Sequence, residues 1–229
     1  MKEKRKATGG VVREVKGNLR FPLDKTYHGC PSIFLPGLLF CPECLRGDPQ
    51  PYFRKIWRLS LSTVCPTHCC YLHDRCPQCS TPLTPYIACR NGQMTDCYKC
   101  GRSLLPDQAW LSAVPDELVS VTKHLLKILD DGIVMIGGSP VYSHLYFRVL
   151  HHILQLMMNR KWGDRLCDDA RPELSGSLTK MFERMSIFDQ AKLIERAVWL
   201  LNEWPERFVD VRLTCPVESV DVSIRPAMS

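Results

Sequence analysis

Residues 40–83 read FCPECLRGDPQPYFRKIWRLSLSTVCPTHCCYLHDRCPQCSTPL, and this stretch decides the fold together with the four residues 97–100. It holds three of four pairs of metal-ligating residues, and the two members of every pair are separated by two residues. The pairs are Cys41-Pro-Glu-Cys44, Cys65-Pro-Thr-His68, Cys76-Pro-Gln-Cys79 and Cys97-Tyr-Lys-Cys100. Such a turn places two ligand atoms on one side, where they can share a tetrahedral ion with a second pair. The sequence therefore predicts two consecutive zinc modules.

The order of the pairs predicts two closed sites. The first is a Cys₃His set of Cys41, Cys44, Cys65 and His68, and the second is a Cys₄ set of Cys76, Cys79, Cys97 and Cys100. Thiolate and imidazole are the donors that zinc favours. Four protein ligands leave no open coordination position, so we expect two structural Zn²⁺ ions as cofactors and no catalytic ion.

Several neighbouring residues leave alternatives open. Cys69, Cys70 and Cys89 compete as ligands, and His73 could replace His68 only by breaking the two-residue spacing. An iron–sulfur cluster is an alternative for the Cys₄ set, and redox-active or free thiols are an alternative for both sets. The three remaining cysteines are interpreted as buried thiols: Cys30, Cys167 and Cys215.

The composition supports metal ligation over disulfide bonding. The chain has 229 residues, of which 45% are hydrophobic, and its 13 cysteines are an odd number. We find neither a secretory signal nor an apolar run of membrane-spanning length, so we expect no membrane partner and a reducing cytoplasm. Short-spaced cysteines in a reducing compartment indicate metal sites.

Positive charge is concentrated in the first half of the chain. The net charge is +6, and the first 20 residues carry seven Lys or Arg against two Asp or Glu. Seven metal-bound thiolates and two divalent ions would together add about −3, so local basic clusters are better evidence for nucleic-acid binding than the total charge.

One local cluster lies between the two halves of the first site. Here Arg54, Lys55 and Arg58 alternate with aromatic residues, and we expect them to face outward on a helical turn and to contact DNA phosphates. The alternative is that Trp57 is only the core of a small domain and that the cations are simply solvated.

The second half of the chain shows helical periodicity. One helix is expected to begin at Asp116 and end at Gly132, a second to open at Ser139-Pro140, and a third to open with the capping box Ser186-x-x-Asp189 and end at Trp204-Pro205. The predicted fold class is a small zinc-ribbon or zinc-finger tandem of short hairpins and helices, followed by an all-α helical domain. The expected boundaries are 1–28 for a basic irregular segment, 29–104 for the tandem, 105–208 for the helical domain and 209–229 for a tail.

The stretch from Phe40 to Leu83 resembles the TniQ/TnsD family of transposon target-selection proteins. The shared frame is Cys-Pro-x-Cys, an acidic-Pro-Tyr-Phe-Arg segment, Trp-Arg-Leu, Val-Cys-Pro-x-His and Leu-x-Asp-Arg-Cys-Pro-x-Cys. A softer similarity covers Phe182 to Phe208. The family's two zinc fingers fall on the two ligand sets given above. The glycine that typically follows the histidine in this family is Cys69 here, and the usual helical segment before the first finger is not apparent in the 40 residues before Cys41.

The resemblance implies a non-enzymatic adaptor in transposition. Such proteins recognise or hold a target, on double-stranded DNA directly or through a guide-RNA effector complex, and recruit an AAA+ ATPase regulator of the transposase. We find no catalytic motif in the sequence and expect no enzyme activity. A protein-interaction scaffold whose fingers do not touch DNA is the alternative, and a homodimer is left open.

Overall fold

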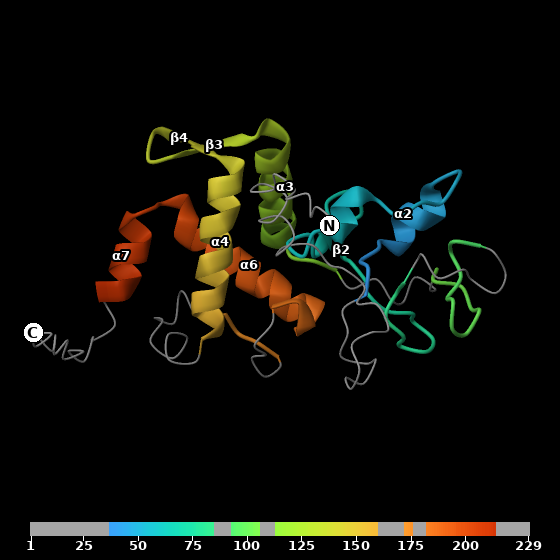
Figure 1. Ribbon diagram of the computed structural model, residues 1–229. Coiled ribbons are helices and arrows are strands. Elements are labelled where there is room, and N and C mark those ends of the chain that lie inside the picture. The colour runs from blue at the N-terminus through green and yellow to red at the C-terminus, as the bar shows by residue number, and fades with distance from the viewer. Residues whose placement is uncertain (1–36, 85–92, 106–112, 160–171, 176–181, 214–229) are drawn as a thin grey trace, which may run out of the picture.

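The computed structural model describes residues 37–84, 93–105, 113–159, 172–175 and 182–213. Figure 1 shows a zinc-module region around α2 and β2 on the right and a bundle of helices on the left, with α3 between α4 and the zinc-module region. The architecture is a zinc-finger tandem followed by a helical region, so the predicted fold class is confirmed. The predictions for residues 1–28 and for Cys30, Cys89, Cys167 and Cys215 concern positions outside the described residues.

The first zinc module combines a short helix with a two-stranded sheet. Helix α2 spans Pro42–Gly47, and the antiparallel strands β1 (Val64–Cys65) and β2 (Cys70–Tyr71) pair Cys65 with Cys70. A 3₁₀ turn, η2 (Lys55–Arg58), lies between them. Proline at the first position of α2 suits its start, because the first helical N–H groups have no intrahelical partner.

Three ligand pairs share one backbone turn. In each, the residue four positions after the first ligand donates its N–H to that ligand's carbonyl: Cys69 to Cys65, Ser80 to Cys76 and Gly101 to Cys97, at 2.8–2.9 Å. All three donors have a positive φ, of 48°, 53° and 71°. Only glycine adopts this conformation without a steric cost, so Cys69 and Ser80 are strained where Gly101 is not.

Two of the three expected helices have the predicted boundaries. Helix α3 spans Asp116–Asp131 and ends at Gly132, whose φ of 73° is the left-handed conformation of a helix C-cap. Helix α6 spans Ile187–Asn202. The Ser186 hydroxyl accepts a 3.1 Å hydrogen bond from the Asp189 N–H, which is the N-cap half of the predicted capping box. The Asp189 carboxylate accepts from the Ser186 hydroxyl at 2.7 Å, whereas in a full capping box it accepts from the backbone N–H of the N-cap residue.

The prediction that a helix begins at Ser139-Pro140 is wrong. Residues Ile133–Ile136 and Ser139–Tyr142 form an antiparallel hairpin, β3–β4, and helix α4 begins only at Ser143 and runs to Met158. Gly137 and Gly138, both with positive φ, form the two-residue turn. This Gly-Gly turn signal outweighs the preference of proline for the first turn of a helix.

The chain after α4 contains two further elements. A short 3₁₀ turn, η4 (Phe182–Arg184), precedes α6. Helix α7 spans Glu206–Leu213 and packs against α6, so helical structure extends past the expected boundary at residue 208. Within the described residues, no helix is long and apolar enough to cross a membrane.

The zinc-module region and the helices share an apolar core. Strand β1 packs against α3, and Val64 is buried with Leu118 and Ala191 in one cluster. The ring of Tyr71 on β2 meets that of Phe188 on α6 edge to face, with centroids 4.6 Å apart. The strands that carry ligands of the first site are therefore also the surface on which the helices pack.

Gly37 packs directly against the backbone of neighbouring segments of the zinc-module region. A Cβ at this position would lie 1.8 Å from the Asp74 carbonyl oxygen and 2.5 Å from the Leu83 amide nitrogen, both backbone atoms. The substitution Gly37→Ala should therefore destabilise the fold by about 1–3 kcal/mol, which thermal unfolding would show as a lower Tm.

Gly47→Ala is the matched control for Gly37→Ala. Its Cβ would meet no atom within 4 Å, so it should leave Tm nearly unchanged. Equal Tm values for the two variants would contradict the close backbone approach at Gly37.

Candidate metal centres

The structure brings the four residues of the first predicted set together. The Sγ atoms of Cys41, Cys44 and Cys65 and a ring nitrogen of His68 all lie within 4.8 Å of one another. Cys41 caps the N-terminus of α2, and its Sγ accepts the Cys44 N–H at 3.4 Å. Cys65 is the last residue of β1, and His68 lies in the turn that follows it. The site thus joins a helix start to a strand end.

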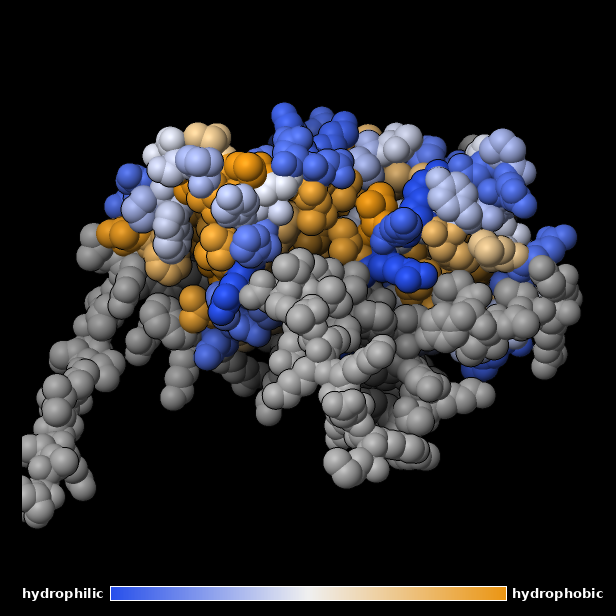
Figure 2. All heavy atoms as spheres, turned by 45° about the horizontal axis from the view of Figure 1, so that its top comes forward, coloured by the Kyte–Doolittle hydropathy of each residue, from blue (hydrophilic) through white to orange (hydrophobic). Residues whose placement is uncertain are grey.

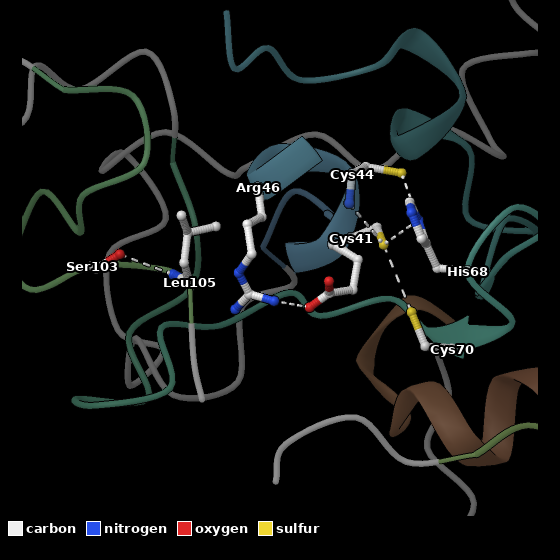
Figure 3. A network of polar contacts seen from close by, with 8 residues as sticks. Cys41, Cys44, Arg46, His68, Cys70, Ser103 and Leu105 are labelled. Atoms are coloured by element: carbon white, nitrogen blue, oxygen red, sulfur yellow. Dashed lines mark hydrogen bonds and ion pairs between the residues drawn. The ribbon is translucent and has the colours of Figure 1, made fainter. Parts of the chain in front are cut away.

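The separations in this cluster match one tetrahedral zinc ion. Zn–S and Zn–N bonds of about 2.3 and 2.0–2.1 Å in a tetrahedron give S···S separations of about 3.8 Å and S···N separations of about 3.6 Å. The observed distances are 3.6 Å between the Cys44 and Cys65 sulfurs and 3.6, 3.3 and 3.6 Å from His68 Nδ1 to Cys41, Cys44 and Cys65. Figure 3 shows Cys41, Cys44 and His68 converging on this centre.

The second set forms an all-sulfur cluster. Cys76, Cys79, Cys97 and Cys100 lie within 4.8 Å of one another, and the Cys76–Cys100 and Cys79–Cys97 sulfur pairs are both 3.7 Å apart. Each half is one of the shared turns described above, closed by an isolated β-bridge, Arg75 to Pro82 or Asp96 to Ser103. The two clusters fit two structural zinc ions, as predicted, and all nine described cysteines are free of disulfides.

The electrostatics of the clusters favour a bound cation. Burial raises the pKa of Cys44, and the neighbouring sulfurs of Cys41 and Cys65 raise it further. Burial likewise raises the pKa of Cys76 to about 12. Hydrogen bonds from Cys41 and then Cys70 lower the pKa of Cys65, so one thiolate is stabilised by the protons of its neighbours. Three thiolates in the first cluster, or four in the second, would repel one another at these distances, and a divalent cation removes that repulsion when it is bound.

The residues that competed as ligands of the first site do not belong to its four-residue cluster. Cys69 is exposed, and the ring of His73 packs against that of Phe40 with centroids 5.9 Å apart. The buried Cys70 is the closest competitor, because its Sγ lies 3.6 Å from that of Cys41. The strand pairing of Cys65 with Cys70 produces this contact, and the spacing of the ligand motif alone did not reveal it.

The three predicted DNA-contacting cations differ in environment. Lys55 and Arg58 are exposed on η2, beside a Trp57 side chain that is 1% exposed. Arg54 does not face outward as expected: it pairs with Asp48 at 3.0 Å and lies over the rings of Tyr52 and Trp57, 4.9 and 5.0 Å from their centroids. Asp48, seven positions after Cys41, is a partner that the spacing of the cations did not indicate.

The site and fold define a class of protein with two structural metal centres, the first of which is fused to a helical region. Among family models, that of the TniQ family matches residues 17–72, a stretch that includes all four residues of the first cluster. The match covers 56 of the 229 residues and shows similarity to the TniQ family over that part of the chain. No curated protein and no solved structure matches the chain.

The two clusters predict a zinc content of two ions per chain. Cys65→Ser and Cys97→Ser should each reduce this content to one, because a three-ligand site holds structural zinc far more weakly. Metal analysis of the purified, desalted protein measures the content. Cys65→Ser should lower Tm more than Cys97→Ser does, because Cys65 ends the strand that packs on α3. One zinc ion in the unsubstituted chain would contradict the model of two sites.

The strained turn at Cys69 gives a separate prediction. Cys69→Gly should raise Tm by about 2–4 °C, since it removes a left-handed strain of about 1 kcal/mol without touching a predicted ligand. Cys69→Ala is the matched control, because it removes the thiol and keeps the Cβ. A rise in Tm for alanine equal to that for glycine would assign the effect to the thiol and not to the backbone.

Proposed function

We propose that this chain is a non-enzymatic, zinc-dependent target-selection adaptor in transposition, and that η2 presents cations to DNA. The observation that carries the proposal is the TniQ match over residues 17–72, which spans both the first cluster and η2. The proposed partners are double-stranded DNA and an AAA+ ATPase regulator, reached directly or as part of a guide-RNA complex.

The rigidity of η2 supports direct DNA contact by its cations. Trp57 is fully buried among the side chains around the first cluster, and Phe53 packs edge to face on it with ring centroids 6.1 Å apart. Lys55 and Arg58 therefore project from a short element that is fixed to a metal site. Among the described residues, neither cation pairs with a carboxylate. Cations held in this way can meet phosphates without losing an existing partner, and such contacts position a protein without specifying sequence.

Arg54 has a different role in this proposal. Its ion pair with Asp48 and its contacts with Tyr52 and Trp57 brace the loop from which η2 starts. The acidic-Pro-Tyr-Phe-Arg segment of the sequence thus contributes to the shape of the loop, and Lys55 and Arg58 supply the exposed charge.

Charge reversal at η2 tests direct contact. Binding of the zinc-loaded chain to duplex DNA should weaken as salt rises, and the double variant Lys55→Glu/Arg58→Glu should reduce the slope of log K against log salt by about 2, since each lost phosphate contact removes about 0.9. Fluorescence anisotropy across a salt series measures both effects.

Two exposed lysines on α3 provide the matched control. Lys123→Glu/Lys127→Glu makes the same change of charge on another element and should leave the slope unchanged. Affinity without salt dependence, or an equal loss for both double variants, would overturn direct contact by η2. The variants should first be shown to hold two zinc ions.

An exposed apolar surface favours a protein partner for the helical region. Ile133, Met135 and Tyr142 on the hairpin and Leu145 and Val149 on α4 are all exposed. Figure 2 shows orange hydrophobic side chains among blue ones over the helical part of the molecule. Exposed apolar side chains gathered on neighbouring elements are typical of protein-binding surfaces. If DNA binding proves insensitive to η2, this surface supports the scaffold alternative.

A further inference from the structure

A fourth thiol, which is not one of the predicted ligands, touches the first metal centre. Cys70 Sγ lies 3.6 Å from Cys41 Sγ, and Figure 3 shows Cys70 on one side of the Cys41 sulfur with Cys44 and His68 on the other. Both thiols are buried, with exposures of 0% for Cys41 and 3% for Cys70. Cys70 is also the strand partner of Cys65, so the backbone of β1 and β2 holds it against the cluster.

Cys70 differs from the other close thiols because it is not one of the four residues that fit the ion. The remaining short sulfur pairs, Cys44–Cys65, Cys76–Cys100 and Cys79–Cys97, each join two predicted ligands. A disulfide in any of these would remove two ligands at once. A disulfide between Cys41 and Cys70 would remove only one. Among the described residues, the second cluster has no comparable extra thiol in contact with it.

We propose that Cys41 and Cys70 form a reversible disulfide when the protein meets hydrogen peroxide, and that this modification opens the first zinc site. Forming the bond needs the two sulfurs to close from 3.6 Å to about 2.05 Å. The two sulfurs lie near the protein surface, because the adjoining His68 and Cys69 are both exposed. Hydrogen peroxide is little larger than water, so it can reach a site this close to solvent.

The chemistry balances with peroxide as the oxidant. The Cys41 thiolate attacks one peroxide oxygen, the O–O bond breaks, hydroxide leaves and a sulfenic acid forms. The Cys70 sulfur then attacks the sulfenic sulfur, the S–O bond breaks, and water leaves with the Cys70 proton as the S–S bond forms. The two thiol groups lose two electrons in total, and one peroxide is reduced to water and hydroxide.

The modification would leave Cys44, Cys65 and His68 as the protein donors of the first site. A site with three of its four ligands holds structural zinc less tightly, and a chelator should then capture the ion. The disulfide also protects Cys41 from further oxidation to the irreversible sulfinic acid. Cys70 would thus make the loss of zinc recoverable.

Mild oxidation of the full, zinc-loaded chain tests the inference. A chromogenic chelator should report release of one of the two zinc ions after stoichiometric peroxide, and alkylation with peptide mass spectrometry should map a Cys41–Cys70 disulfide. Thiol reductant with added zinc should restore the content of two ions. A disulfide mapped between two predicted ligands, or between Cys65 and Cys70, with none between Cys41 and Cys70, would overturn the inference. This measurement needs no variant.

Cys70→Ser is the matched variant. It keeps the shape of the side chain, removes the thiol and leaves all four predicted ligands in place, so it should still bind two zinc ions. After peroxide, its recovery of the first ion should fall about fivefold or more, and sulfinic acid should accumulate at Cys41. Cys69→Ser, at the exposed neighbour, should recover as the unsubstituted chain does. Equal recovery for Cys70→Ser would overturn the role of Cys70, whether or not the adaptor function holds, because no readout involves DNA.

Discussion

The closure of the Cys₃His cluster is the interaction on which the rest of the structure depends. It ties the start of α2 to the turn between β1 and β2, across 20 intervening residues that have little regular structure beyond one 3₁₀ turn. Those strands then pack on α3 and α6 through Val64 and Tyr71. Structural zinc typically supplies about 10–16 kcal/mol of binding free energy in such modules, far more than these few apolar contacts could supply alone.

The second cluster extends this arrangement by repetition. Its two halves use the same turn as Cys65 to Cys69, with a donor N–H four residues after the first ligand and a positive φ at the donor. Cys97, in the second half, is buried in the same core as Cys41 and Trp57, so both clusters share one apolar interior. A small region poor in regular structure is thereby held at two metal centres and one common core.

The ligand spacing made the metal sites predictable, because a Cys-x-x-Cys or Cys-x-x-His turn is a local feature. The ends of α3 and α6 were equally local, set by Gly132 and by the capping pair Ser186 and Asp189. The errors occurred where signals competed or were long-range. Proline at position 140 suggested a helix start, yet the preceding Gly-Gly turn directs the chain into a hairpin. The inward position of Arg54 and the contact of Cys70 with Cys41 depend on partners distant in sequence, and no periodicity encodes them.

The edge-to-face contact of Tyr71 with Phe188 has a consequence for geometry. Because one strand carries both this ring and a neighbour of the metal ligands, the helices cannot swing relative to the first finger without breaking the contact. A protein that grips the helical bundle would therefore set the direction in which η2 points. In such an arrangement, the angle between the helices and the first zinc module fixes how the module is oriented on its target. A change in that angle would reorient the module without altering any residue on its contact surface.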